Sequence, residues 1–205
     1  MKNEMIKNTL ILTMITLVSG LLLGLVYEIT KEPIGEAQAK ATQEAYAEVF
    51  AEADEFVEYA GFDADEANEY VASFEACVND TIDGVVVAYA DGEEVGYVIT
   101  VTAHDGYGGD ITFTMGVTND YILNGISFLS ISETAGLGMN ATKESFSSQF
   151  ANIGVQGFQV VKTGSTAESE IDAISGATIT SEAVTNGVNA GLLYWEYITG
   201  GVSYE

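Results

Sequence analysis

The most uniform feature of the sequence is an uncharged, mostly apolar run from Thr9 to Tyr27. A helix of this length rises about 28 Å, close to the roughly 30 Å of a bilayer's hydrocarbon core. Lys2 and Lys7 precede the run, and positive residues favour the cytoplasmic side of a transmembrane helix. A cleaved signal peptide is the alternative, but its apolar core is usually about 7–15 residues, and the Ala-x-Ala match at 37–39 lies well beyond the run. The pattern predicts a retained single-pass helix with its N-terminus in the cytoplasm.

Helical sequence continues after this run. Pro33 is expected to end the membrane helix, because proline lacks an amide donor and disrupts a helix interior. Residues 34–62 are rich in alanine and glutamate, which predicts a second helix. Residues 64–78 predict a shorter helix that ends near Asn79.

The pattern changes to short β-rich runs after Ile82. Residues 83–103 contain two such runs around Asp91-Gly92, the strongest hairpin signal in the chain. Residues 110–132 repeat the pattern, with a turn expected at 118–120. Alternating apolar positions predict one buried sheet face in this segment, namely Ile111, Phe113 and Met115.

Three further elements are expected toward the C-terminus. Residues 142–153 predict a short helix with Thr142 as its N-cap, and residues 157–164 predict a strand. The last helix is expected from Thr180 to Ile198, with one apolar face that includes Val184, Val188, Leu192 and Trp195. Helices, an antiparallel meander, then a strand and a helix predict an α+β fold with an antiparallel sheet and flanking helices.

This organisation predicts three regions. Residues 1–30 are the cytoplasmic N-terminus and transmembrane helix, residues 31–80 a helical connector, and residues 81–205 an α+β domain.

Charge and composition exclude several classes of function. The formal net charge is −25 with six lysines and no arginine, which argues against nucleic-acid binding. From Glu32 onward there are 29 acidic residues and three lysines. This agrees with a single-pass protein of the cytoplasmic (inner) membrane whose C-terminal domain is extracytoplasmic. One cysteine, Cys77, and one histidine, His104, cannot supply a disulfide, an iron–sulfur cluster, a metal site or a catalytic triad. No catalytic residue and no metal ligand is therefore expected, and any redox chemistry needs an organic cofactor.

Three glycine-bearing loops could approach a ligand closely, at residues 104–111, 133–138 and 172–181. The third loop ends where the last helix begins, so a phosphate near Thr178 would face free backbone N–H groups. No His or Lys lies nearby in sequence to activate this hydroxyl as a nucleophile. Thr178 is therefore expected to be an acceptor hydroxyl that another enzyme modifies, with Thr180 as the rival acceptor.

The loops resemble three segments of the FMN-binding domain family. The run DAISGATITS at 172–181 resembles the family's flavinylation motif, in which a dedicated transferase joins FMN to a threonine through a phosphoester bond. The runs GYGGDI at 106–111 and ETAGLG at 133–138 resemble the segments that line the flavin site. Asp110 and Ala135 stand where proline is usual in the family.

The resemblance implies covalent FMN on Thr178 and assigns the surrounding residues to its site. Lys162 precedes the motif on a predicted strand and is added as a candidate contact for the phosphate or the ring. The cofactor-binding set is Asp172, Ser175, Gly176, Ala177, Thr178, Thr180, Tyr107, Gly108, Gly109, Glu133, Thr134, Gly136, Leu137, Gly138 and Lys162.

Motif order, the single membrane helix and the chain length together resemble G subunits of the Rnf ion-translocating ferredoxin:NAD oxidoreductase complexes. The resemblance implies an electron carrier that works with other subunits of a membrane redox complex, matured by a flavin transferase and coupled to Na⁺ or H⁺ movement. Three alternatives remain open on the sequence. They are a C-subunit-like flavoprotein of a sodium-pumping NADH:quinone reductase, a free-standing extracytoplasmic FMN carrier, and a non-redox, membrane-anchored acidic binding domain.

Overall fold

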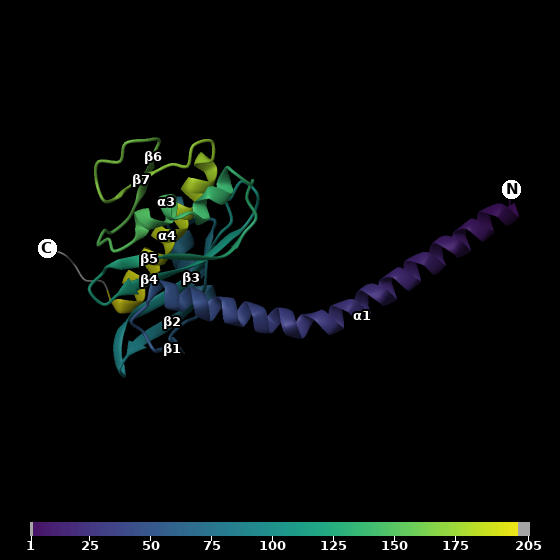
Figure 1. Ribbon diagram of the computed structural model, residues 1–205, viewed down its shortest axis with the longest axis horizontal. Helices are drawn as coiled ribbons and strands as arrows, with labels where there is room; N and C mark the ends of the chain where they lie inside the picture. The colour runs from purple at the N-terminus through teal and green to yellow at the C-terminus, as the bar shows by residue number, and fades with distance from the viewer. Residues whose placement is uncertain (1, 201–205) are drawn as a thin grey trace. The chain divides into compact units, whose positions relative to one another are not determined.

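The computed structural model describes residues 2–200 and divides the chain into two compact units, residues 1–42 and 43–205 (Figure 1). Among the described helices, only α1 (Lys2–Val49) is long and apolar enough to cross a membrane. Its apolar stretch is not buried against other described residues. The prediction that Pro33 ends this helix was wrong, because α1 continues through it. A proline removes one backbone hydrogen bond, and the alanines and glutamates that follow are good helix formers.

The predicted antiparallel meander is confirmed. Five strands pair in chain order, and every pair is antiparallel. The Asp91-Gly92 hairpin is also confirmed, because both residues have positive φ, 52° and 81°, as a two-residue turn of this twist requires. The strands are β1 (Glu55–Glu58), β2 (Asp80–Ala90), β3 (Glu93–Ala103), β4 (Ile111–Thr118) and β5 (Leu123–Ile131).

The helix predicted over residues 34–62 was wrong in its second half. Helix α1 ends at Val49, and β1 pairs with the end of β2, with Glu55 opposite Tyr89. The alanine and glutamate content favours helix locally, but pairing with a neighbouring strand overrides such a weak preference.

The remaining elements surround the sheet. The predicted N-cap Thr142 was wrong, since Thr142 closes η2 and the following helix begins after Lys143 with no side-chain cap. Strand β6 confirms the strand expected at 157–164 and pairs in parallel with β7, which the sequence did not indicate. These elements are α2 (Ala64–Ala72), η1 (Glu75–Cys77), η2 (Gly138–Thr142), α3 (Glu144–Ser147), η3 (Ser148–Phe150), β6 (Gln159–Val161), β7 (Glu170–Asp172) and α4 (Thr178–Thr199).

Helix α4 packs against one face of the sheet and forms the main core with it. The predicted apolar face of α4 is confirmed. Gly191 allows α4 to approach the sheet closely, because a Cβ at this position would collide with Met115 Sδ. The α+β architecture is therefore as expected. The buried positions that were predicted on the two elements are Val184, Val188, Leu192 and Trp195, and Ile111, Phe113 and Met115.

The opposite face of the sheet carries a second, smaller core. Val49 and Phe50, where α1 ends, pack against Val86, Ala88 and Val98. The Phe50 side chain is completely buried. The end of α1 is thus part of the folded domain.

Candidate functional site

The three glycine loops, far apart in sequence, meet around one cavity of about 550 Å³. This volume lies within the range of small-molecule and cofactor sites. The end of the third loop and the first residues of α4 form one wall, and the other two loops form the rest. The lining residues are Tyr107, Glu133, Thr134, Leu137, Gly138, Gly176, Ala177, Thr178, Ile179 and Thr180.

Two of the loops contain the same type of hydrogen-bonded turn. Leu137 N donates to Thr134 O at 3.1 Å, and Ala177 N donates to Ile174 O at 2.9 Å. The third residue of each turn is a glycine with positive φ, 79° at Gly136 and 77° at Gly176. Such turns need a residue that tolerates positive φ, which explains the glycines at these two positions.

The first loop is held against the second by a hydrogen bond. Gly108 N donates to Glu133 Oε1 at 3.2 Å, and a Cβ on Gly108 would collide with Ser132 O. The two backbones therefore approach at a distance that no side chain at position 108 would allow. The Glu133 side chain is itself buried, with 9% exposure.

The two threonines of the third loop have opposite environments. Thr178 is the first residue of α4 and is exposed, whereas Thr180 is only 1% exposed. Small residues, Gly176 and Ala177, precede Thr178, and the positive end of the α4 dipole lies beside it. An exposed hydroxyl can be reached by a modifying enzyme, and a buried one cannot without local opening.

The first turn of α4 is locked to the loop. Ser181 Oγ accepts from Ile174 N at 2.9 Å and donates to Ala177 O at 3.0 Å. The position of Thr178 is thereby fixed by buried hydrogen bonds on both sides.

Some of the expected site residues lie elsewhere. Asp172 accepts hydrogen bonds from Ser165 N and Oγ, and together with Ser175 it lines a separate cavity of about 520 Å³. Lys162 is exposed just after β6 and lines neither cavity, whereas Lys143 lines the cavity beside Ser175. Gly109 and Gly136 shape the turns without lining the main cavity.

The mouth of the main cavity is apolar. Tyr107, Leu137 and Ile179 are 71%, 42% and 51% exposed, an unusual density of exposed apolar side chains at one place on the domain. Sequence reasoning missed Ile179, whose signal was its position between the two threonines of the motif. Flat apolar contacts at the mouth and buried polar groups inside fit an isoalloxazine ring, which has an apolar and a polar end.

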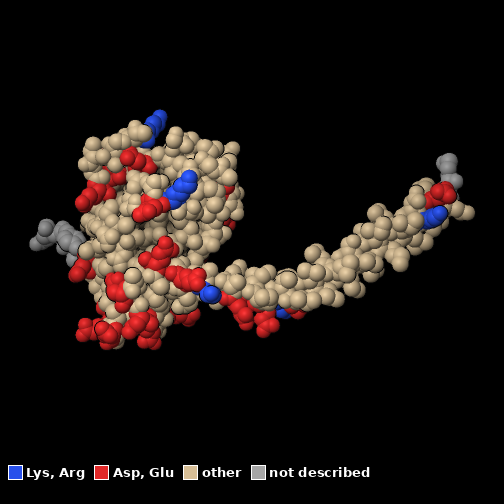
Figure 2. All heavy atoms as spheres, viewed as in Figure 1, with Lys and Arg blue, Asp and Glu red and all other residues tan. Residues whose placement is uncertain are grey.

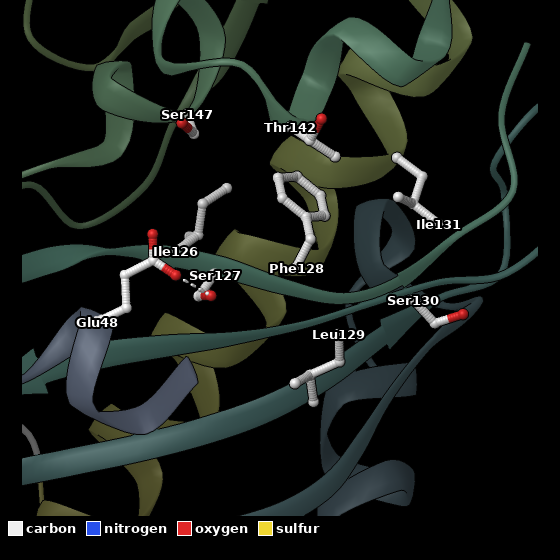
Figure 3. Close-up of a pocket in the computed structure, with 9 residues that line it drawn as sticks. All are labelled: Glu48, Ile126, Ser127, Phe128, Leu129, Ser130, Ile131, Thr142 and Ser147. Carbon is white, nitrogen blue, oxygen red and sulfur yellow. Dashed lines mark hydrogen bonds between the residues drawn. The ribbon is translucent and has the colours of Figure 1, made fainter. Parts of the chain in front are cut away.

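A third cavity, also of about 520 Å³, opens beside β5 (Figure 3). Figure 3 shows Phe128 directed toward Thr142, with Leu129 on the other side of the strand. The Glu48 carboxylate accepts from Ser127 Oγ at 2.5 Å across this cavity. None of the residues of the three glycine loops lines this cavity.

Charged residues are distributed unevenly over the domain. In the view of Figure 2, acidic side chains gather over the part that holds β1 and β2. The domain therefore presents a negative surface that repels anionic partners.

A polar cluster supports the base of the first glycine loop. His104 Nδ1 lies 2.8 Å from Asp110 Oδ1, so this contact joins the two ends of the loop. Asn79 Nδ2 donates to both carboxylate oxygens of Asp105. Asp80 is buried beside them with 5% exposure. Burial, with a further contribution from Asp105, raises the pKa of Asp80 to about 7, against a smaller lowering by His104.

This raised pKa predicts a pH-dependent stability. An unfolded aspartate has a pKa of about 3.9. The folded state therefore holds a proton that the unfolded state has lost, and stability falls as pH rises from about 4 to about 7. Asp80→Asn is expected to melt higher than the wild type at pH 8, with a difference that shrinks toward pH 4. Thermal melting of the full chain in detergent across pH 4–8 measures this, with the exposed Asp54→Asn as control. A difference that does not depend on pH would contradict the assignment.

Comparison with known proteins agrees with the geometry. The family model for the FMN-binding domain matches residues 106–193, and the model for the RnfG N-terminal region matches residues 1–49. The G subunit of the Na⁺-translocating ferredoxin:NAD⁺ oxidoreductase complex of Acetobacterium woodii is 30% identical, covering 93% of this chain and 91% of that protein. The G subunit of the proton-translocating ferredoxin:NAD⁺ oxidoreductase complex of Clostridium ljungdahlii is 32% identical, covering 98% and 96%.

A solved structure resembles part of the chain. The crystal structure of Shewanella oneidensis NqrC matches with a TM-score of 0.47 and 19% identity, covering 57% of this chain and 61% of that one.

Proposed function

We propose a function from the premise that this chain belongs to the family of G subunits of ion-translocating oxidoreductase complexes. It is an electron-transfer flavoprotein subunit of such a complex, with an FMN-binding domain and an N-terminal apolar helix. Beyond this, we infer that FMN is bound covalently through its phosphate to Thr178. The observation that carries this inference is the exposed Thr178 hydroxyl at the start of α4, on the edge of the cavity that the three loops form.

For this attachment the chain supplies the Thr178 hydroxyl and the N-terminus of α4. A transferase would supply the flavin as a dinucleotide: Thr178 Oγ would form an ester bond to the FMN phosphorus, the pyrophosphate bond would break, and the nucleoside monophosphate would leave with the hydroxyl proton. The resulting phosphodiester would lie at the N-terminus of α4, where backbone N–H groups and the helix dipole stabilise negative charge. The first turn of α4 contains no acidic residue that would oppose it.

FMN in this position supplies reversible one- and two-electron chemistry, and the chain supplies the site. Tyr107, Leu137 and Ile179 would cover the ring against water, and the hydrogen-bonded turns at 134–137 and 174–177 would hold it in one place. A covalent tether suits a cofactor outside the cytoplasm, where a dissociated flavin would be lost. We therefore propose that α1 anchors the subunit in the cytoplasmic membrane with the domain on the outer side, where a flavin transferase matures it.

The test is co-expression of the full chain with and without a flavin transferase. Intact-mass analysis is expected to show one added FMN only when the transferase is present, and the denatured band is expected to fluoresce as flavin. A wild-type chain that gains no mass and no fluorescence in the presence of the transferase overturns covalent attachment. In that case purification of a yellow but unmodified chain would leave noncovalent FMN as the form of binding.

A further inference from the structure

One polar group in the cavity lacks a partner. Thr180 Oγ1 is fully buried and has no hydrogen-bond partner in the described part of the chain. A buried hydroxyl without a partner is destabilising, so such groups in native proteins usually serve a ligand, an ion or a water. Its neighbours on α4 show the contrast, because the buried Thr185 hydroxyl donates to Ser181 O at 2.8 Å.

The Thr180 hydroxyl lies beside a buried carboxylate. Gly138 is the residue between them: a Cβ there would lie 2.7 Å from Thr180 Oγ1 and 2.6 Å from Glu133 Oε2. All three residues line the cavity. The absence of a side chain at Gly138 therefore leaves one donor and one acceptor facing the same small volume.

Among residues 2–200, a hydrogen-bond donor reaches one of the two Glu133 carboxylate oxygens. Glu133 Oε1 accepts from Gly108 N at 3.2 Å, which leaves Oε2, on the Gly138 side, available as an acceptor. The floor of the cavity thus presents a hydroxyl donor next to a carboxylate acceptor. The apolar residues Tyr107, Leu137 and Ile179 lie at the mouth.

This arrangement matches the chemistry of a flavin ring, whose pyrimidine edge carries an N–H donor between two carbonyl acceptors. We propose that Thr180 is not an acceptor for flavinylation but the positioning residue that donates to this edge, with Glu133 accepting from it. The proposal rests on FMN occupying this cavity. The polar edge is then held at the floor, and the chain of the cofactor runs back to the exposed Thr178.

Both groups should tune the flavin's reduction potential, in opposite directions. A donor to the ring stabilises the electron-rich reduced form, so Thr180→Val should lower the midpoint potential. A nearby carboxylate opposes added negative charge, so Glu133→Gln should raise it. Loss of a hydrogen bond of the usual strength corresponds to about tenfold in the equilibrium constant, or about 30 mV for a two-electron couple.

The experiment is a spectroelectrochemical titration of the full chain, flavinylated by co-expression and purified in detergent. Thr180→Val, Glu133→Gln and the wild type are compared, with Thr185→Val as the control because it removes a buried hydroxyl of the same helix that lies outside the cavity. Thr180→Ser, which keeps the hydroxyl, is expected to return the potential toward the wild-type value.

Opposite shifts in the two variants, with none in Thr185→Val, support the proposal. Flavinylated variants with wild-type potentials overturn it and leave Thr178 attachment intact, because the adduct is scored separately by mass. If Thr180→Val takes up no flavin, Glu133→Gln decides: an unchanged potential in that variant overturns the proposal. Loss of the adduct in the wild type would instead contradict the proposed function itself.

Discussion

Replacement of Thr178 by alanine is expected to remove the covalent flavin completely, whereas Thr180→Val keeps it. The reason is accessibility: the Thr178 side chain is exposed at the start of α4, and Thr180 is 1% exposed. Both variants are co-expressed with a flavin transferase and examined by intact mass and by flavin fluorescence after denaturation. Alanine at position 178 removes only one small exposed side chain, so the fold should persist, with a melting temperature close to that of the wild type.

Two outcomes would contradict this assignment. A full adduct on Thr178→Ala would move the attachment to another hydroxyl, and loss of the adduct in Thr180→Val alone would favour Thr180 as the acceptor. Thr178→Ser is the matched control, since it restores a hydroxyl at the same place and should recover at least part of the adduct. The two threonines could not be separated from sequence, because both lie in one short motif of small and hydroxyl residues.

The site was predictable from sequence where it depends on local backbone. Gly136 and Gly176 occupy turns that need positive φ, and Thr178 begins a helix whose apolar periodicity is strong. The three motifs therefore indicated three ligand-facing turns. That they share one cavity was implied only by the family resemblance, since no local pattern encodes a contact such as that between Gly108 and Glu133.

Contacts between distant segments were the part that sequence could not supply. Lys162 is predicted as a site residue because it precedes the motif, yet the lysine that lines a cavity together with Ser175 is Lys143, which lies between η2 and α3. The helix prediction for residues 50–62 was wrong for a similar reason, because it also used the local sequence alone. Their alanine and glutamate content describes an isolated segment, and the pairing of β1 with β2 is decided by strands about 30 residues apart.

The same limit hid the role of Phe50. Within the predicted helix it was an ordinary apolar residue, but it is completely buried on the second face of the sheet. Glycines at two strand positions make room for it: a Cβ would lie 2.7 Å from the Phe50 ring at Gly96 and 2.9 Å from it at Gly116. The sheet is thus shaped to receive the residue that follows α1.

Phe50→Ala is therefore expected to destabilise the domain by about 3–5 kcal/mol, the usual cost of removing a buried phenylalanine. For a domain of this size the melting temperature should fall by on the order of 10 °C, measured by thermal unfolding of the full chain in detergent. Phe56→Ala is the matched control, because Phe56 belongs to the same small core but is only half-buried, and its loss should cost clearly less. Equal effects in the two variants would show that the end of α1 adds no more to the domain than the edge strand does. Because Phe50 does not line the main cavity and lies outside its three loops, the flavin adduct on the folded protein should be unchanged.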